Sequence, residues 1–112
     1  MTDEIQMGLM QPHALLISSL IVHAERHHSD AQIVSRRVEG DIHRYQWRDV
    51  ARRSRQVARV LDAMALPLSS RVATLAWNGY RHLELYFGVS GSGRVLHTIN
   101  PRLHPDQIAW IA

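Results

Sequence analysis

Two apolar runs of strand length constrain the fold of this chain more than any other feature. Residues 71–77 and 95–99 are almost uninterrupted apolar runs, the first ended by Asn78-Gly79 and the second preceded by residues 91–93. Strands that are apolar on both faces belong to sheets covered on both sides, and such sheets are usually parallel. Because adjacent parallel strands need a crossover of about a dozen residues, we expect an α/β fold with a parallel strand–helix–strand unit.

The segment between these two runs can be interpreted in two ways. Leu83, Leu85 and Phe87 alternate as in a strand, and Asn78-Gly79 would then form a hairpin turn. At helical spacing, Leu83, Phe87 and Ser90 share one face, with Asn78 as the N-cap. Periodicity barely separates the two, but the length required of a parallel crossover favours the helix.

The preceding residues predict a helix, a β-hairpin and a second helix. Residues 15–28 have helical periodicity with Pro12 suited to the first turn, and residues 33–38 and 42–45 are β-prone runs on either side of a turn that contains Gly40. A longer amphipathic helix is expected over 47–66, ended by Pro67. Its apolar stripe comprises Trp47, Val50, Ser54, Val57, Leu61 and Met64.

The last residues predict a further helix that starts at Pro105. Its apolar residues Ile108, Trp110 and Ile111 are followed at once by Ala112, without a cap, so we expect a truncated element. With 112 residues there is room for one small domain at most. An apolar content of 46% with 21% charged residues predicts a packed core.

The composition excludes several kinds of chemistry. All 13 basic residues are arginine, so a phosphate-binding lysine, a Schiff-base lysine and a lysine general base are impossible. Cysteine is also absent, which excludes disulfides, thiolate nucleophiles and cysteine-ligated zinc. The apolar run over 14–24 is preceded by Asp3 and Glu4 and is too short to span a bilayer. We therefore expect a cytoplasmic protein without a signal peptide or membrane span.

A stripe of arginines suggests an alternative function. Arg48, Arg52, Arg55 and Arg59 recur at spacings of four, three and four, and the net charge is +3. Such a stripe could contact phosphates, as in a small nucleic-acid or acidic-partner binding module. Against this alternative, helical spacing would pair Asp49 with Arg53 and Asp62 with Arg59, and no known docking motif is present. A solvated helix face is the favoured interpretation.

Histidines and loop residues supply the other site candidates. His23 and His27 stand at i and i+4, but without a third ligand nearby no metal site is expected. His97 is expected to be a packed strand histidine. Asn100 and Arg102 follow the carboxyl end of a predicted parallel strand, where α/β folds bind ligands, and are the candidate substrate-binding residues. No catalytic residue is identified.

These segments resemble the N-terminal region of bacterial fatty-acyl-CoA synthetases in the adenylate-forming superfamily. The similarity covers the chain from about Pro12, and residues 97–103, His-Thr-Ile-Asn-Pro-Arg-Leu, carry much of it. Residues 44–50 resemble the family's first core motif, and residues 91–101 its second. Two departures concern the turn at Ser69-Ser70, which is usually Gly-Asp, and Arg94, where the family has a small residue. The other segments that resemble the family are 33–36, 71–78, 81–84 and 107–111.

The resemblance implies an ATP-dependent fatty acid–CoA ligase that uses ATP, Mg²⁺ and coenzyme A to form an acyl-adenylate and then a thioester. The family's lysine-ended phosphate loop, ribose-binding acid, hinge and late lysine have no counterpart here. We therefore expect residues 1–112 to be part of the large domain, with 1–11 as a flexible leader. Alone, the chain is expected to hold no cofactor, to be inactive and to self-associate through apolar strand edges.

Overall fold

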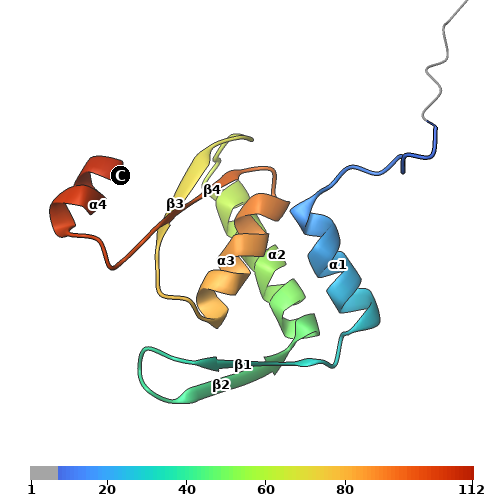
Figure 1. Cartoon of the computed structure of the whole chain (residues 1–112), viewed down its shortest axis with the longest axis horizontal. Helices are drawn as coiled ribbons and strands as arrows, with labels where there is room; N and C mark the ends of the chain where they lie inside the picture. Colours follow the sequence, from blue (N-terminus) through green and yellow to red (C-terminus); the bar gives the residue numbers. More distant parts are fainter. Residues whose placement is uncertain (1–7) are drawn as a thin grey trace, which may run out of the picture.

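The computed structural model describes residues 8–112 and has a mixed α/β architecture, as the sequence predicts (Figure 1). Residues 1–7 of the expected leader lie outside the described residues, and residues 8–11 are exposed. The described elements are α1 (Ile17–His27), β1 (Gln32–Arg36), β2 (Ile42–Gln46), α2 (Trp47–Ala63), β3 (Arg71–Leu75), α3 (Tyr80–Gly91), β4 (Val95–Ile99) and α4 (Pro105–Ile111).

The parallel strand–helix–strand unit is confirmed. Strands β3 and β4 pair in parallel with Arg71 opposite Val95 and Leu75 opposite Ile99, and α3 makes the crossover between them. The hairpin alternative for this segment is therefore wrong. The predicted N-cap is also wrong, because Gly79 and not Asn78 occupies the N-cap position and no side chain of that residue caps the helix.

The β-hairpin is confirmed as well. Strands β1 and β2 pair antiparallel, with Ile33 opposite Tyr45, and Gly40 in the connecting turn has a φ of +98°, which favours glycine. Helix α2 starts directly after β2. A reciprocal capping box fixes this junction, because the Gln46 side chain accepts from the Asp49 backbone and the Asp49 carboxylate accepts from the Gln46 N–H at 3.1 Å.

Helix α2 ends earlier than predicted, and Pro67 does not end it. Ala65 adopts a left-handed φ of +55°, its N–H donates to the Asp62 carbonyl at 2.9 Å, and the Leu66 N–H donates to the Leu61 carbonyl at 3.3 Å. These two bonds form a Schellman motif, which satisfies the last carbonyls of the helix before the proline is reached. Helix α1 likewise starts only at Ile17, so Pro12 is not in its first turn.

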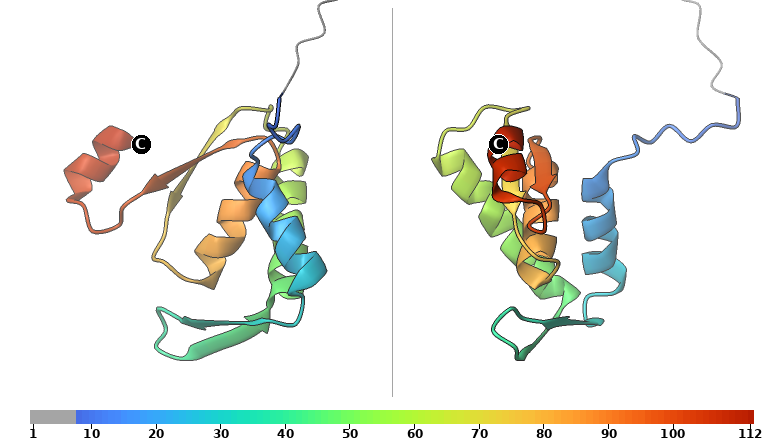
Figure 2. Two further views of the ribbon diagram at one scale, coloured as in Figure 1. Left: turned by 45° about the vertical axis from the view of Figure 1, so that its right-hand side comes forward. Right: turned by 60° about the vertical axis from the view of Figure 1, so that its left-hand side comes forward.

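The core lies between α2 and α3. Val50 and Leu61 from α2 and Val89 from α3 are buried, and the backbone of Gly88 approaches Val57 closely. Most of the predicted apolar stripe of α2 therefore faces the core, but Met64 at its end is exposed. In the views of Figures 1 and 2, α1 lies beside these two helices, and none of its residues is fully buried.

The parallel strands are less covered than their sequences predict. Within residues 8–112 only Thr74 of β3 and Ile99 of β4 are buried, whereas Leu75 keeps 57% of its surface exposed. Helix α3 packs against this pair, and Figure 1 and the left view of Figure 2 show α4 set apart from the other helices. Among the described residues, none of the helices has both the length and the apolar character needed to cross a membrane.

Candidate functional site

A pocket of about 790 Å³ opens at the carboxyl ends of β3 and β4. This position follows from the parallel pairing, because both strands end at the same edge of the sheet and α3 starts beside them. The lining residues come from the loop before α3, the first turns of α3, the end of β4 and the turn that follows β4. They are Ala76, Trp77, Asn78, Gly79, His82, Leu83, Tyr86, Thr98, Ile99, Asn100, Pro101 and Arg102.

Both candidate residues from the sequence, Asn100 and Arg102, lie in this pocket. The Asn100 side-chain oxygen accepts a hydrogen bond from the Arg102 N–H at 3.0 Å, which fixes the turn after β4. The Arg102 guanidinium carbon lies 5.6 Å from the centroid of the Trp77 ring, a cation–π arrangement that joins the two walls of the pocket. Their part in ligand binding stays a prediction.

A second polar pair in this region was not identified from the sequence. The Thr74 hydroxyl and His82 Nε2 lie 3.1 Å apart and form a hydrogen bond between β3 and α3. Thr74 is buried, whereas His82 also lines the pocket. The one signal available was a threonine in the middle of an apolar strand, because a buried hydroxyl needs a partner.

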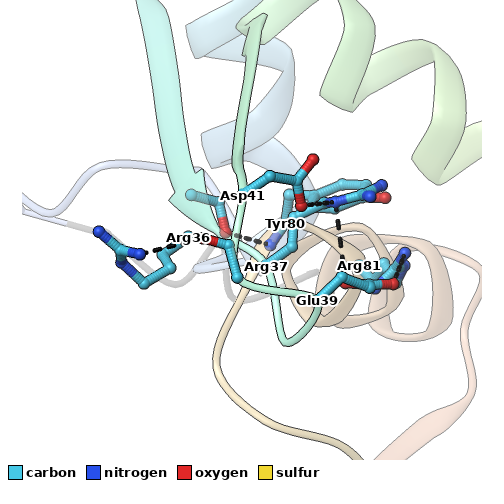
Figure 3. Close-up of polar contacts among 8 residues, drawn as sticks. Arg36, Arg37, Glu39, Asp41, Tyr80 and Arg81 are labelled. Atoms are coloured by element: carbon cyan, nitrogen blue, oxygen red, sulfur yellow. Dashed lines mark hydrogen bonds and ion pairs between the residues drawn. The ribbon is translucent and has the colours of Figure 1, made fainter.

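The hairpin contacts the start of α3, next to the pocket. Figure 3 shows the hairpin turn facing the first residues of this helix. Arg81 pairs with Glu39 at 2.9 Å, and Arg37 pairs with Asp41 at 2.7 Å. The hydrogen bond from Arg81 holds the pKa of Glu39 below its usual value, and Arg37 does the same for the pKa of Asp41. Both carboxyl groups therefore stay ionised at neutral pH.

A buried carboxylate joins α2, β2 and α3. Glu84 on α3 is buried, and it accepts from Arg53 Nε of α2 at 2.6 Å and from the Tyr45 hydroxyl of β2 at 3.1 Å. Burial, followed by the charge of Glu84, raises the pKa of Tyr45, so that its hydroxyl remains a donor. The network satisfies a buried charge, so its role is structural.

The arginine stripe is largely neutralised by ion pairs, two with residues outside α2 and one within it. Arg48 pairs with Asp30 at 2.9 Å and Arg52 with Asp49 at 3.2 Å, while Arg55 binds both oxygens of the Glu25 carboxylate. These pairs take up the charge of three of the four arginines, which weakens the alternative of a nucleic-acid or acidic-partner module.

The two ion pairs predicted from helical spacing do not form, so this prediction is wrong. Arg53 turns away from Asp49 to the buried Glu84, and Asp62 pairs with Arg94 at 2.9 Å instead of with Arg59. Arg94, at a position where a small residue was expected, is itself buried and donates to the Leu66 carbonyl at 2.6 Å. Partially desolvated partners from other elements therefore prevail over exposed neighbours on the same helix.

The histidine candidates lie outside the pocket. The His23 and His27 rings are 4.8 Å apart on α1, and over residues 8–112 no group of three potential ligands is placed to hold a metal ion. His97 is half-buried on β4 and does not line the pocket.

Comparison with known proteins agrees with this architecture. Residues 21–112 match the family model described as AMP-binding enzyme. The chain is 53% identical over 105 residues to a 3-methylmercaptopropionyl-CoA ligase of Ruegeria pomeroyi, and 46% identical to a medium-chain-fatty-acid–CoA ligase of Ectopseudomonas oleovorans. A long-chain-fatty-acid–CoA ligase of Thermus thermophilus is 48% identical over 80 residues.

These alignments differ in how much of each protein they cover. The first two cover 94% of this chain but 20% and 19% of the relatives, and the third covers 71% of this chain and 15% of the relative. The chain thus spans about a fifth of the length of the curated relatives that it matches. Because the family model extends over most of the 112 residues, the chain belongs to the AMP-binding enzyme family.

Proposed function

We propose that this chain forms part of an ATP-dependent ligase that joins a fatty acid, or a related acid with an apolar chain, to coenzyme A through an acyl-adenylate. The observation that carries the proposal is the 53% identity to a CoA ligase over 94% of the chain. The named acids of the relatives differ, but each is a carboxylic acid activated as a CoA thioester. On this proposal residues 1–112 belong to one AMP-binding domain.

Asn100 and Arg102 are proposed to contact an anionic substrate group at the pocket. Within the described residues, Arg102 and His82 are the pocket's basic side chains. These two basic side chains suit a single anionic group. They do not fit a magnesium-bound triphosphate, which several cations must surround. ATP, Mg²⁺ and coenzyme A are therefore assigned to the whole ligase, and the 112 residues alone are proposed to be inactive.

The decisive experiment replaces the matched 105 residues of the Ruegeria ligase with the corresponding part of this chain. We expect the chimaera to form acyl-CoA, whereas the 112-residue chain shows no fatty-acid-dependent pyrophosphate exchange. Arg102→Ala in the chimaera should raise the KM for the substrate whose anionic group binds at the pocket about tenfold. Arg59→Ala, at an exposed arginine outside the pocket, should leave this KM unchanged. A folded chimaera without ligase activity, or exchange by the chain alone, would contradict the proposal.

Location and association follow from the same proposal. The ligase is placed in the cytoplasm because its co-substrates ATP and coenzyme A are cytoplasmic metabolites. The isolated chain is proposed to self-associate, because Leu75 and Val95 on the parallel pair and Trp110 on α4 are exposed. Sedimentation at several concentrations tests this, and a monomer that binds no apolar dye would refute it.

A further inference from the structure

Helix α3 starts without a cap of its own. Its N-cap residue, Gly79, has no side chain that could accept from the first turn, although the first N–H groups of a helix need acceptors. The Oγ of Ser35 on β1 fills this role, since it accepts a hydrogen bond from the Tyr80 N–H at 3.1 Å. The cap is thus supplied by a residue 45 positions earlier in the chain.

Other residues of the hairpin also contact Tyr80 and its neighbour Arg81. The His43 ring stacks on the Tyr80 ring with 3.8 Å between centroids, and the Tyr45 hydroxyl, whose one proton is shared with Glu84, lies 3.4 Å from the Tyr80 carbonyl oxygen. The next residue, Arg81, donates to both carboxylate oxygens of Glu39 at 2.9 and 3.3 Å. We call these contacts, together with that of Ser35, the hairpin clamp; its turn portion is visible in Figure 3.

The hairpin clamp acts on a wall of the pocket. Tyr80 directly follows residues 76–79, which line the pocket opposite Asn100 and Arg102, and Trp77 within this loop lies under the Arg102 guanidinium. The loop lies directly against β1, because a Cβ built at Gly79 would be in ordinary van der Waals contact with Ser35 Oγ, at 3.4 Å. A shift of the hairpin would therefore move the loop and the ring that orients Arg102.

Among the clamp contacts, the Ser35 hydrogen bond is expected to matter most. The Arg81–Glu39 pair is about half exposed on both sides, and exposed pairs contribute little. The Ser35 bond is partly buried and satisfies a backbone donor that would otherwise lack a partner. We propose that Ser35 is a positioning residue, which sets the pocket wall over residues 76–79 for the substrate group bound at Arg102. This inference rests on the proposed ligase function.

The test compares Ser35→Ala, Ser35→Thr and Ser19→Ala in the chimaeric ligase that carries this chain. Ser35→Thr keeps a hydroxyl at the capping position, and Ser19→Ala removes a similar side-chain bond, to the Leu16 carbonyl, from α1. We expect Ser35→Ala to speed amide exchange over residues 80–83 about fivefold to tenfold. The same variant should raise the KM for the substrate bound at Arg102 about threefold to tenfold, with kcat nearly unchanged. The other two variants should resemble the parent.

The outcomes distinguish the capping role of Ser35 from its positioning role. Unchanged exchange at 80–83 in Ser35→Ala would overturn the capping role, and faster exchange with an unchanged KM would overturn the positioning role. Faster exchange over the whole chain in Ser35→Ala would mean general destabilisation and would also count against positioning. If the parent chimaera is folded but inactive, the proposed function fails, while the exchange measurement still tests the cap.

Discussion

Replacement of Gly88 by alanine probes the closest approach between α2 and α3. Gly88 is buried, and a Cβ at this position would lie 2.6 Å from Val57 Cβ, 2.7 Å from Val57 Cγ1 and 2.8 Å from the Ser54 carbonyl oxygen. Non-bonded carbons prefer separations of about 3.5–4.0 Å, so the helices must move apart by roughly 1 Å. The obstructing atoms include backbone, which cannot rotate away.

Two opposing effects set the size of the change. Alanine in a helix interior is favoured over glycine by about 1 kcal/mol, whereas an extra methyl group forced into a packed interface costs about 1–3 kcal/mol and occasionally more. Because the Gly88 contacts involve a β-branched side chain and a carbonyl oxygen, we place the packing cost at or above the upper end of this range. The net expectation is a loss of about 2 kcal/mol in the free energy of unfolding.

Gly91→Ala on the same helix is the matched control. Its Cβ would meet only Ser18 Cβ, at 3.8 Å, which is an ordinary contact. This variant should be neutral or more stable by up to about 1 kcal/mol. Urea unfolding followed by far-ultraviolet circular dichroism at low protein concentration measures both. If Gly88→Ala is as stable as Gly91→Ala, the close packing of α2 on α3 is not as described.

Three further predictions concern the helix end, the buried carboxylate and the hairpin turn. Ala65→Gly should raise the free energy of unfolding by about 1 kcal/mol in the same assay, because φ is +55° there; a loss would argue against the Schellman motif. Glu84→Gln should cost about 1–2 kcal/mol by weakening the charged bond to Arg53, and a neutral result would mean that this carboxylate is not paired. The lowered pKa of Glu39 means that its pair with Arg81 is fully present above the usual value of 4.5 and is lost as the pH falls through the lowered value. The protection of the turn amides, measured relative to their intrinsic exchange rate at each pH, should therefore fall as the pH is lowered below 4.5. Glu39→Gln should reduce that pH dependence, and the remainder is assigned to Asp41, whose pKa is lowered by Arg37 in the same turn.

The elements with strong local signals could be predicted from the sequence. The apolar runs at 71–77 and 95–99 contain β3, which ends at Leu75, and β4; the 3.6-residue periodicity predicted α2, and Gly40 marked the turn of the hairpin. Even the ambiguous segment before Gly91 was assigned correctly, because parallel strands require a crossover. The position of Asn100 and Arg102 beside the pocket followed from the same topology, although their binding role is untested.

The partners of the polar residues were decided only by the tertiary structure. Arg53 and Glu84 are 31 residues apart in the chain, Asp62 and Arg94 are 32 apart, and Ser35 lies 45 before Tyr80. Helical spacing suggested nearer partners for Arg53 and Asp62, but exposed pairs on one helix contribute only a few tenths of a kcal/mol, roughly. A partner that is buried or partly desolvated binds more strongly, and burial depends on how the elements pack, which local spacing does not specify.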